Sequence, residues 1–348
     1  MRSGIDLVVT NLHRNYTGVS ATAAGVVKGQ AGRYRMLLAG RALPSCMPPV
    51  PLRRALRRSR SPAPGHKYVL WHVRRNNEIR AALLARDILK LPVRIVFTSA
   101  ARRRHSAVPR WLISQADAVI ATTEKAAAFV PNVHAVVHHG VDAERFRPAE
   151  DRAAAWKLGQ YPGKFGIATI GRVRPEKGTD LFVEAMIRLL PHYPEATALI
   201  IGKVTATQRS FQGELKRQID AAGLTKRIIF TGEIAAGQLP QLVRSLSLLV
   251  AAARYEGYGM TPLEAMASGV PVIASDTGFF PAFIGVNEAG ILVDRLDAGQ
   301  ILSSARSMID NPGEMERMSS RARQRAISLF GLESEIDGIH RVYEKLWT

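Results

Sequence analysis

Residues 165–190 read FGIATIGRVRPEKGTDLFVEAMIRLL. An apolar run of strand length, Phe165–Ile170, precedes a loop with two glycines, and in Asp180–Leu190 the apolar residues recur at helical spacing. Such strand–loop–helix units repeat along the chain. Their alternation is typical of parallel sheets with helices on both faces, so the sequence predicts an α/β fold.

The alternation occurs twice. The first series has strand-like runs at Ile5–Val9, Arg35–Ala39, Tyr68–His72, Arg94–Thr98, Ala118–Thr122 and Ala135–His138; the second has them at Phe165–Ile170, Ala198–Ile201, Ile228–Thr231, Leu248–Ala252, Val270–Ala274 and Gly290–Val293. Arg147–Gly163, with a proline near each end, is expected to be the linker. We therefore expect two doubly wound, Rossmann-like domains facing a central cleft, residues 1–147 and 148–330. After a break at Gly331, a C-terminal helix, residues 331–348, is expected to pack back on the first domain.

Charge is distributed unevenly along the chain. The 348 residues carry a formal net charge of +19, but residues 1–150 hold 25 Lys and Arg against 8 Asp and Glu. This excess of positive charge in the first half favours an anionic partner. The candidates are nucleic acid, anionic lipid and a phosphorylated substrate. A merely solvated basic face is the alternative. Helix-turn-helix, zinc-finger and aromatic RNA-stacking signatures are lacking in the sequence, so nucleic acid is the weakest of the three.

Two arginine clusters account for much of this charge. The first lies between Pro44 and Pro64, a proline-dense segment that predicts a long surface loop, with one basic turn of helix at Leu52–Ser59. We expect both clusters to contact an anionic acceptor or membrane; they comprise Arg53, Arg54, Arg57, Arg58 and Arg60, and then Arg102, Arg103 and Arg104.

Several protein classes are excluded by composition. A hydrophobic content of 47% excludes a disordered chain, and the single cysteine, Cys46, excludes a disulfide framework. No apolar run approaches the roughly 20 residues of a membrane span, and polar residues interrupt the start of the chain. We therefore expect a soluble, cytosolic protein.

The first motif follows Phe165–Ile170. Gly171 and Gly178 permit a tight backbone path, while Arg172 and Lys177 place two cations at the end of a strand, just before a helix. Two cations and a helix N-terminus form a good receptor for a diphosphate. The alternative is a loop with ordinary exposed charges.

The second motif, residues 256–269, reads EGYGMTPLEAMASG and follows the strand Leu248–Ala252. Gly257 and Gly259 let the backbone approach a ligand closely, and the amides of Met260 and Thr261 would point toward an anion at a helix N-terminus. Two glutamates, Glu256 and Glu264, flank this turn. Alternatively, Glu256 is a surface acid of the loop and Glu264 interacts with the dipole at the start of the helix. The two motifs together favour a ligand site.

With these motifs the sequence resembles the retaining GT-B glycosyltransferases of glycosyltransferase family 4. His139-Gly140-Val141-Asp142, with Phe146 and Pro148, and Gly290-Ile291-Leu292-Val293, with Asp297, also carry the resemblance. It implies an acceptor-side first domain and a second domain that binds a nucleotide-sugar donor.

Roles for individual residues follow from this resemblance. It implies that Arg172 and Lys177 hold the donor diphosphate, that Glu264 holds the ribose and that Glu256 faces the transferred sugar. The loop at Gly18 approaches the donor, although Thr17 stands where the family often has another glycine. His105 fits the place of a sugar-contacting histidine; its alternative is a basic-patch residue, and His72, His138 and His139 also lie at strand ends.

One segment departs from the family pattern. After Ser275-Asp276 the family often has a glycine pair followed by a glutamate. Here the run is Thr277-Gly278-Phe279-Phe280-Pro281-Ala282, so Phe279 replaces the second glycine and Ala282 stands where the acid would be.

A narrower resemblance lies in the first half. Residues 71–78 (WHVRRNNE), 97–105 (FTSAARRRH) and 116–122 (ADAVIAT) look like the lipopolysaccharide core mannosyltransferases of rhizobia and their relatives. This resemblance implies GDP-mannose as donor and a Kdo-bearing lipid A precursor as acceptor. It also implies peripheral contact with the anionic inner face of the inner membrane.

No metal cofactor is expected, because the chain contains no Asp-x-Asp run; cations and helix amides would stabilise the leaving diphosphate instead. Three alternatives stay open. They are a family-4 transferase with another donor or acceptor, a GT-B-shaped sugar-nucleotide epimerase, and a non-catalytic membrane or nucleic-acid binding protein.

Overall fold

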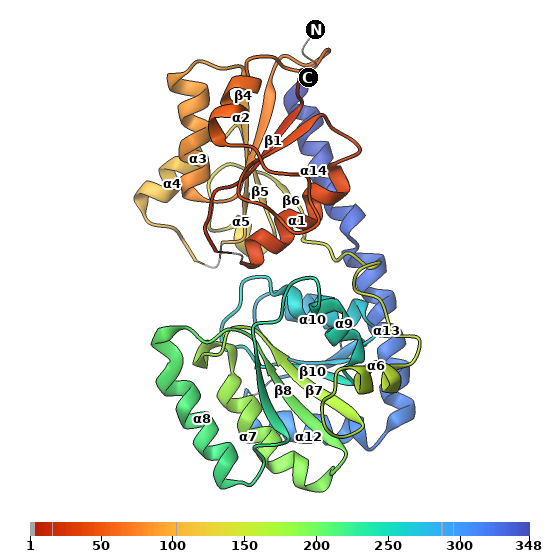
Figure 1. Ribbon diagram of the computed structural model, residues 1–348. Coiled ribbons are helices and arrows are strands. Elements are labelled where there is room, and N and C mark those ends of the chain that lie inside the picture. Colours follow the sequence, from red (N-terminus) through yellow and green to blue (C-terminus); the bar gives the residue numbers. More distant parts are fainter. Residues whose placement is uncertain (1–3, 16, 102, 287, 295) are drawn as a thin grey trace. The chain divides into compact units, whose positions relative to one another are not determined.

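The computed structural model describes residues 4–348 except Tyr16, Arg102, Asn287 and Arg295. The chain divides into two compact units (Figure 1): unit 1 is Met1–Gly140 with Phe330–Thr348, and unit 2 is Val141–Leu329. The boundary thus falls after Gly140, whereas the sequence predicted it after Arg147. The end of the chain lies in unit 1.

Unit 1 contains a six-stranded sheet in the order β2-β1-β3-β4-β5-β6, and every pairing in it is parallel. Each strand overlaps a predicted apolar run. The strands are β1 Leu7–Asn11, β2 Met36–Gly40, β3 Val69–Val73, β4 Val93–Ser99, β5 Ala118–Ala121 and β6 Val133–Val136. Since β1 pairs with both β2 and β3, the direction of winding changes between β1 and β3.

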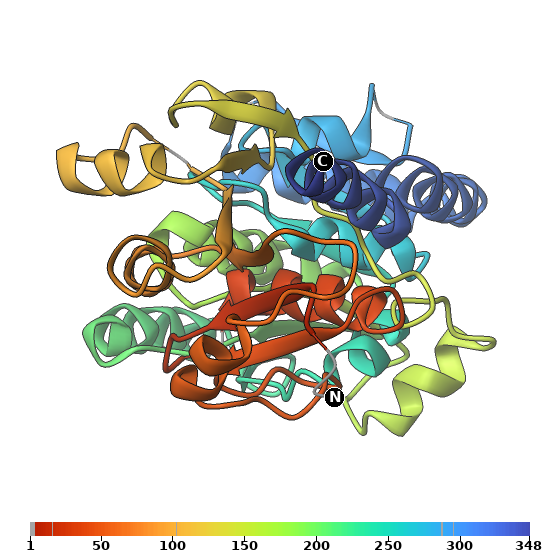
Figure 2. The same cartoon turned by 90° about the horizontal axis from the view of Figure 1, so that it is seen from above.

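Side chains alternate between the two faces of this sheet. Leu7, Val9 and Leu70 pack with the helices α1 and α14, whereas Val8 and Trp71 pack with α2, α3 and α4. In Figures 1 and 2, α14 lies on the opposite side of unit 1 from α3 and α4. The helices are α1 Gly18–Gln30, α2 Leu52–Arg58, α3 Asn76–Leu83, the π-helical turn η1 Leu84–Ile88, α4 Ala107–Ser114, α5 Glu124–Ala127 and α14 Leu332–Trp347.

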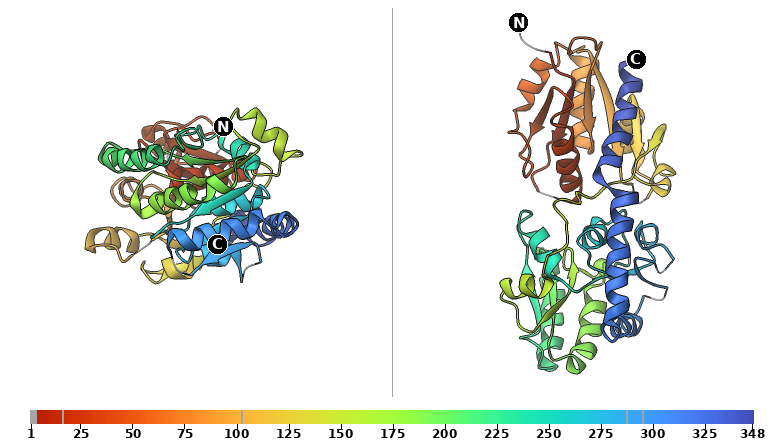
Figure 3. Two further views of the ribbon diagram at one scale, coloured as in Figure 1. Left: turned by 90° about the horizontal axis from the view of Figure 1, so that it is seen from below. Right: turned by 90° about the vertical axis from the view of Figure 1, so that its right-hand side faces the viewer.

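The C-terminal helix α14 follows α13 after a break at Gly331, whose extended backbone interrupts the helical path (Figure 3). It lies against α1, where a side chain at Gly29 would overlap Ile336. Its inner face also reaches the sheet, because the hydroxyl of Tyr343 lies 2.5 Å from Nδ1 of His72. α14 is therefore part of the unit 1 core.

Unit 2 contains a second sheet, in the order β12-β11-β10-β7-β8-β9, again parallel throughout. The strands are β7 Phe165–Ile170, β8 Ala196–Ile201, β9 Ile228–Gly232, β10 Leu248–Ala251, β11 Val272–Ser275 and β12 Gly290–Val293. Here β7 pairs with β8 and β10, so the winding direction changes between β7 and β10. The predicted pair of doubly wound parallel sheets is confirmed.

The helices of unit 2 are α6 Arg152–Leu158, η2 Pro175–Lys177, α7 Thr179–Leu189, η3 Leu190–His192, η4 Ala206–Gln208, α8 Arg209–Ala221, α9 Leu239–Ser245, α10 Met260–Ala267, α11 Phe280–Ile284, α12 Ala298–Ile309 and α13 Pro312–Phe330. α7, α8 and α12 enclose one apolar core with the sheet. The expected linker is wrong in part, because Arg147–Gly163 contains α6. Trp156 on α6 is only 1% exposed and its indole donates to the carbonyl of Gly163, so this segment belongs to the unit 2 core.

Candidate active site

The two sequence motifs meet at one edge of the unit 2 sheet. The first follows the carboxyl end of β7, and the second follows the carboxyl end of β10. These neighbouring strands flank the point where the winding direction changes, which is where open α/β sheets bind ligands. The sheet order therefore places both motifs at the expected kind of site.

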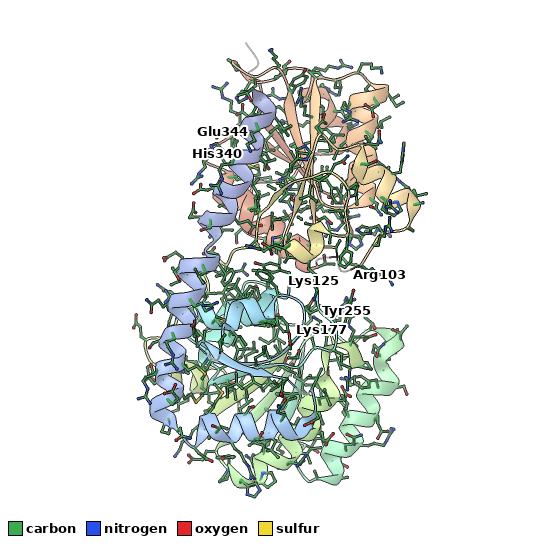
Figure 4. The ribbon with its side chains drawn as sticks, turned by 180° about the vertical axis from the view of Figure 1, so that it is seen from behind. Arg103, Lys125, Lys177, Tyr255, His340 and Glu344 are labelled. Atoms are coloured by element: carbon green, nitrogen blue, oxygen red, sulfur yellow. The ribbon has the colours of Figure 1, made fainter. Side chains whose placement is uncertain are left out.

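Lys177 and Glu256 form an ion pair across this edge. Glu256 is nearly enclosed, with a side chain 5% exposed, and its second oxygen accepts the amide of Gly257 at 2.8 Å. Lys177 stays 23% exposed and lies on the same side of unit 2 as Tyr255 (Figure 4). A cation thus projects from a buried carboxylate toward solvent.

Gly178 fixes the path of the first motif. Its φ is +66°, and a Cβ there would overlap the carbonyl oxygen of Ala252, the residue just after β10. Only glycine fits such a left-handed position at this close approach. The glycine therefore lets Lys177 reach Glu256 and lets α7 begin at Thr179.

Arg172 is exposed, and within the described part of the chain no side chain forms an ion pair or hydrogen bond with it. It follows Gly171 directly after β7. Its guanidinium is consequently available to an anion at the edge that Lys177 also faces.

Sequence reasoning missed Arg254. Its guanidinium forms two parallel hydrogen bonds to the carboxylate of Asp180, at 2.8 and 2.6 Å, and its amide donates to the carbonyl of Glu176. Such a bidentate pair holds two segments in a defined geometry. Arg254 thus fastens the segment after β10 to the Lys177 loop, a contact between residues far apart in the sequence.

The helix α10 begins after Gly259, whose φ of +80° brings the chain close to Phe280. The first turn of α10 contains no acidic side chain, and Gly259 supplies no side-chain cap. The amides of Met260 and Thr261, two of the first helical residues, thus receive no cap from the residue at the N-cap position. Unbonded N–H groups at a helix N-terminus attract anions.

Glu264 lies one turn further along α10 and is partly buried. Burial raises the pKa of its carboxyl from 4.5 to about 7, and Arg145 acts in the opposite direction. A carboxyl with this pKa changes charge near neutral pH, so its state responds to a ligand that desolvates it or bonds to it.

Replacement of Glu264 by Gln is expected to stabilise the ligand-free protein more at about pH 8 than at about pH 5. Between pH 4.5 and about 7 the folded state binds a proton that the unfolded state has released, so the free energy of unfolding of the parent falls as pH rises. Glutamine removes this loss. The measurement is the difference in Tm between Glu264→Gln and the parent at both pH values.

Glu150→Gln, which changes an exposed acid of the same unit, is the matched control and should show no such pH dependence. An equal Tm difference for Glu264→Gln at both pH values would contradict the raised pKa.

The departure at Phe279 produces an aromatic cluster. The rings of Tyr258 and Phe279 stack at 4.9 Å between centroids, and Phe283 meets both rings edge-on at 5.3 Å. Offset and edge-on contacts of this kind stabilise a loop beyond their buried area. The segment after β11 is therefore built on aromatic packing in place of the second glycine of the family pattern.

Unit 1 has its own cluster where its winding direction changes, and Arg75, just after β3, is its centre. The guanidinium donates to Asn11 at the end of β1 (3.2 Å), to Thr17 (3.1 Å) and to Ser20 (2.9 Å) beside the start of α1, and to buried Glu78 (3.1 Å). Arg75 thereby holds the N-terminus of α1, where the predicted Gly18 lies with open space around its Cα.

Arg74 is buried beside this cluster. Among the described residues, its two terminal nitrogens have no hydrogen-bond partner, and burial lowers its pKa. Glu78 and Glu335 lie close enough to favour its charge. Leaving buried N–H groups unbonded is costly. The buried guanidinium of Arg74 therefore costs stability at this edge of unit 1. The sequence analysis assigned no role to Arg74 or Arg75, which lie in the stretch 71–78 that carries the narrower resemblance.

The four histidines considered from the sequence differ in their surroundings. His72 is fully buried between Tyr343 and Thr98, which keeps its pKa well below the usual value, and Nδ1 of His139 lies 2.7 Å from Glu335. His138 lies beside Thr122 and Glu124. His105 is partly exposed in the loop between β4 and α4. The structure thus places His72 and His139 in the framework of unit 1 and His105 nearer to solvent.

The arginine clusters lie mainly at the surface. Of the first cluster, Arg53, Arg54, Arg57 and Arg60 are exposed and Arg58 is partly exposed, and the predicted basic helical turn is confirmed as α2. Arg103 and Arg104 are exposed, whereas Arg102 lies outside the described residues.

Two features are absent from the described residues. No group of three or more His, Cys, Asp or Glu there is arranged to hold a metal ion. No helix among them has the length and apolar character of a membrane span.

The sequence was compared with known proteins. The family model described as "Glycosyl transferases group 1" matches residues 150–325. Over 346 residues the chain is 38% identical to the lipopolysaccharide core biosynthesis mannosyltransferase LpsB of Rhizobium meliloti, covering 98% of both chains. It is 39% identical over 346 residues to the lipopolysaccharide core biosynthesis mannosyltransferase LpcC of Rhizobium leguminosarum bv. viciae, covering 98% of this chain and 97% of that one.

Solved structures are similar as well. The C-terminal domain of LpcC, a glycosyl transferase group 1 family protein from Francisella tularensis, is 37% identical, with a TM-score of 0.54 over 56% of this chain and all of that one. HepE of Anabaena in complex with UDP and glucose has a TM-score of 0.81 over 98% of this chain and all of that one, at 18% identity. The second likeness concerns the fold alone and agrees with the fold class predicted from the sequence.

Proposed function

The chain belongs to the group 1 glycosyl transferases, and we propose that it is a retaining mannosyltransferase acting in lipopolysaccharide core biosynthesis. In this proposal mannose moves from GDP-mannose to the Kdo-bearing inner core of lipid A. One observation carries the catalytic part: Lys177 and Glu256, 79 positions apart, pair at the edge where the unit 2 sheet changes its winding direction. The choice of mannose and of this acceptor is supported by the two relatives that are similar over nearly the whole chain.

The proposed chemistry centres on a leaving diphosphate. Negative charge grows on GDP as the bond to mannose breaks, and fixed cations and amides stabilise such charge without reorganising. Arg172 and Lys177 supply the cations, and the amides of Met260 and Thr261 supply the helix N-terminus. Glu264 accepts the ribose hydroxyls. Glu256 holds Lys177 in place and faces the sugar.

The proposed acceptor is strongly anionic, because lipid A carries phosphates and Kdo carries a carboxylate. Residues 1–150, most of unit 1, have 25 Lys and Arg against 8 Asp and Glu. Each cation near an anionic membrane contributes about 1 kcal/mol of attraction. The exposed arginines at 53–60 and at 103–104 therefore suit peripheral contact with the inner face of the inner membrane, where such an acceptor resides.

A transfer assay with a panel of nucleotide sugars tests the donor. We expect a hexose to be added to Kdo-bearing lipid A from GDP-mannose, at an undiminished rate in EDTA, because the proposed stabilisation of the diphosphate needs no metal ion. The readout is the mass of the lipid product and its rate of formation, with and without EDTA.

Three results would contradict parts of this proposal. Transfer from UDP-glucose but not from GDP-mannose would assign another donor within the family. Conversion of the nucleotide sugar without any acceptor would indicate an epimerase. Binding of the lipid without turnover of any donor would leave a non-catalytic binding protein.

A further inference from the structure

Large hydrophobic side chains are exposed in one region of unit 1. Among its described residues, six such side chains are exposed, and five of them lie on η1, directly after it, or on α4. We call these five the apolar face: Leu84 (42% exposed), Ile88 (71%), Leu89 (47%), Val108 (58%) and Trp111 (60%). Scattered apolar residues are ordinary on a surface, but a group of five large ones is a sign of an interaction site.

The helix α4 carries large apolar side chains both in the core and at the surface. Leu112 and Ile113 are buried in the unit 1 core, while Val108 and Trp111, three positions apart and so on one side, face outward. Here the inner side is covered by the sheet and the outer side lacks a protein cover in the described chain.

The two segments of the apolar face adjoin each other. α3, which continues into η1, packs against α4. The guanidinium of Arg86 on η1 donates to the carbonyl of Gln115, just after α4, at 2.9 Å and to Asp117 at 2.8 Å. The last part of η1 and the end of α4 therefore adjoin each other.

Positive charge lies beside the α4 part of this face. Residues 100–116 contain four arginines and no acid, and Arg103, Arg104 and Arg110 are exposed among those described. Arg103, which is labelled in Figure 4, lies in the loop before α4. Asp87, the acid on η1, is paired with Arg86 at 2.7 Å. An apolar surface with cations beside it complements a membrane that has anionic headgroups over an acyl interior.

The arginine-rich helix α2 differs from this region. Its apolar residues Leu52, Ala55 and Leu56 pack against the unit 1 core, so it presents to solvent mainly charges. Such a helix attracts an anionic membrane over a distance but inserts nothing into it. The two regions therefore predict different salt dependence, since screening weakens charge attraction and leaves apolar burial in place.

We propose that the apolar face inserts into the interface of an anionic membrane, with Trp111 at headgroup depth and Arg103, Arg104 and Arg110 on the lipid phosphates. Tryptophan is suited to this depth because its ring is apolar while its N–H can bond to water or headgroups. This proposal deepens the proposed function by naming the surface that meets the lipid, and it rests on that function for the presence of a lipid acceptor.

The fluorescence of Trp111 can report whether the apolar face enters the membrane. Trp71 and Trp156 are at most 1% exposed, and Trp347 stacks on His66, whereas Trp111 is 60% exposed. Vesicles of phosphatidylglycerol and phosphatidylcholine that carry brominated acyl chains should quench the tryptophan fluorescence of the parent. They should leave Trp111→Phe unquenched, although this variant still binds.

Sedimentation with the same vesicles at about 0.1 M and about 1 M salt separates insertion from attraction. The double variant Val108→Ser/Trp111→Ser should partition about tenfold more weakly at both salt concentrations, because it loses apolar burial. The matched control, with Arg53, Arg54, Arg57, Arg58 and Arg60 changed to Ser, should bind more weakly than the parent at low salt and as well as the parent at high salt.

Quenching that is absent in the parent, or unchanged partition of the double variant, would overturn the proposal. A vesicle-free protein that sediments as a dimer, and becomes a monomer in the double variant, would do the same by assigning the face to a second copy. Turnover of the nucleotide sugar in solution should be equal in parent and double variant. Insertion without any sugar transfer by the parent would support the membrane surface while refuting the proposed function.

Discussion

Alanine in place of Arg172 or of Lys177 is expected to lower kcat by about two to three orders of magnitude, the usual effect of removing one preorganised stabiliser of a leaving group. The two variants should differ in stability. Arg172 is exposed and unpaired among the described side chains, so its loss should leave Tm unchanged. Lys177 pairs with a glutamate side chain that is 5% exposed, so its loss strands a buried charge and should lower Tm. Steady-state kinetics and thermal unfolding of both variants measure this difference.

The double variant Lys177→Ala/Glu256→Gln provides the control. Removing the stranded charge should restore part of the Tm lost in Lys177→Ala without restoring turnover. Near-parental kcat in Arg172→Ala and Lys177→Ala would show that neither cation faces the diphosphate. A fall in Tm for Arg172→Ala as large as that for Lys177→Ala would contradict the structure, in which Arg172 is exposed and Lys177 pairs with a buried glutamate.

Alanine in place of Arg75 is expected to have the largest effect on folding in unit 1, about 3–5 kcal/mol from the free energy of unfolding, as for other broken buried ion pairs. The side chain of Arg75 is 15% exposed and that of Glu78 is fully buried. The same change releases the start of α1 at Thr17 and Ser20, so turnover should fall as well. Denaturant unfolding and the transfer assay measure the two effects.

Lysine in place of Arg75 is the matched comparison. It keeps a charge for Glu78 but cannot reach Asn11, Thr17 and Ser20 at once, because it lacks the planar fork of arginine. We expect stability to recover more than turnover. If Arg75→Ala unfolds at the parental denaturant concentration with parental turnover, the cluster at the winding change of unit 1 is neither structural nor functional.

The elements of the fold were predictable where local pattern decides them. Apolar runs such as Phe165–Ile170 and Gly290–Val293 coincide with β7 and β12, because a buried parallel strand needs a continuous apolar stretch. The helix at Met260–Ala267 follows a glycine that turns the chain and contains Pro262 in its first turn. α4 and α6 were not predicted. α6 lies between two prolines, and its burial depends on Trp156 reaching a core formed by distant residues.

The candidate site was predictable as motifs but not as contacts. That Lys177 and Glu256 belong to one site follows from the order of strands, which brings β7 beside β10. Their ion pair, the Arg254–Asp180 clamp and the Arg75 cluster join residues that no local pattern relates. Histidines illustrate the same limit: the sequence gives four at strand ends, and only the partners of His72 and His139 distinguish framework from surface. The apolar face likewise depends on which side of α4 the sheet covers.

A structure of the full chain with GDP-mannose bound tests the central claim most directly. The claim is that the diphosphate binds where the unit 2 sheet changes its winding direction. The account predicts phosphate oxygens within hydrogen-bond distance of Arg172, Lys177 and the amides at the start of α10, and ribose hydroxyls on Glu264. A diphosphate bound elsewhere, for example on Arg75 of unit 1 with Arg172 and Lys177 facing water, would contradict it.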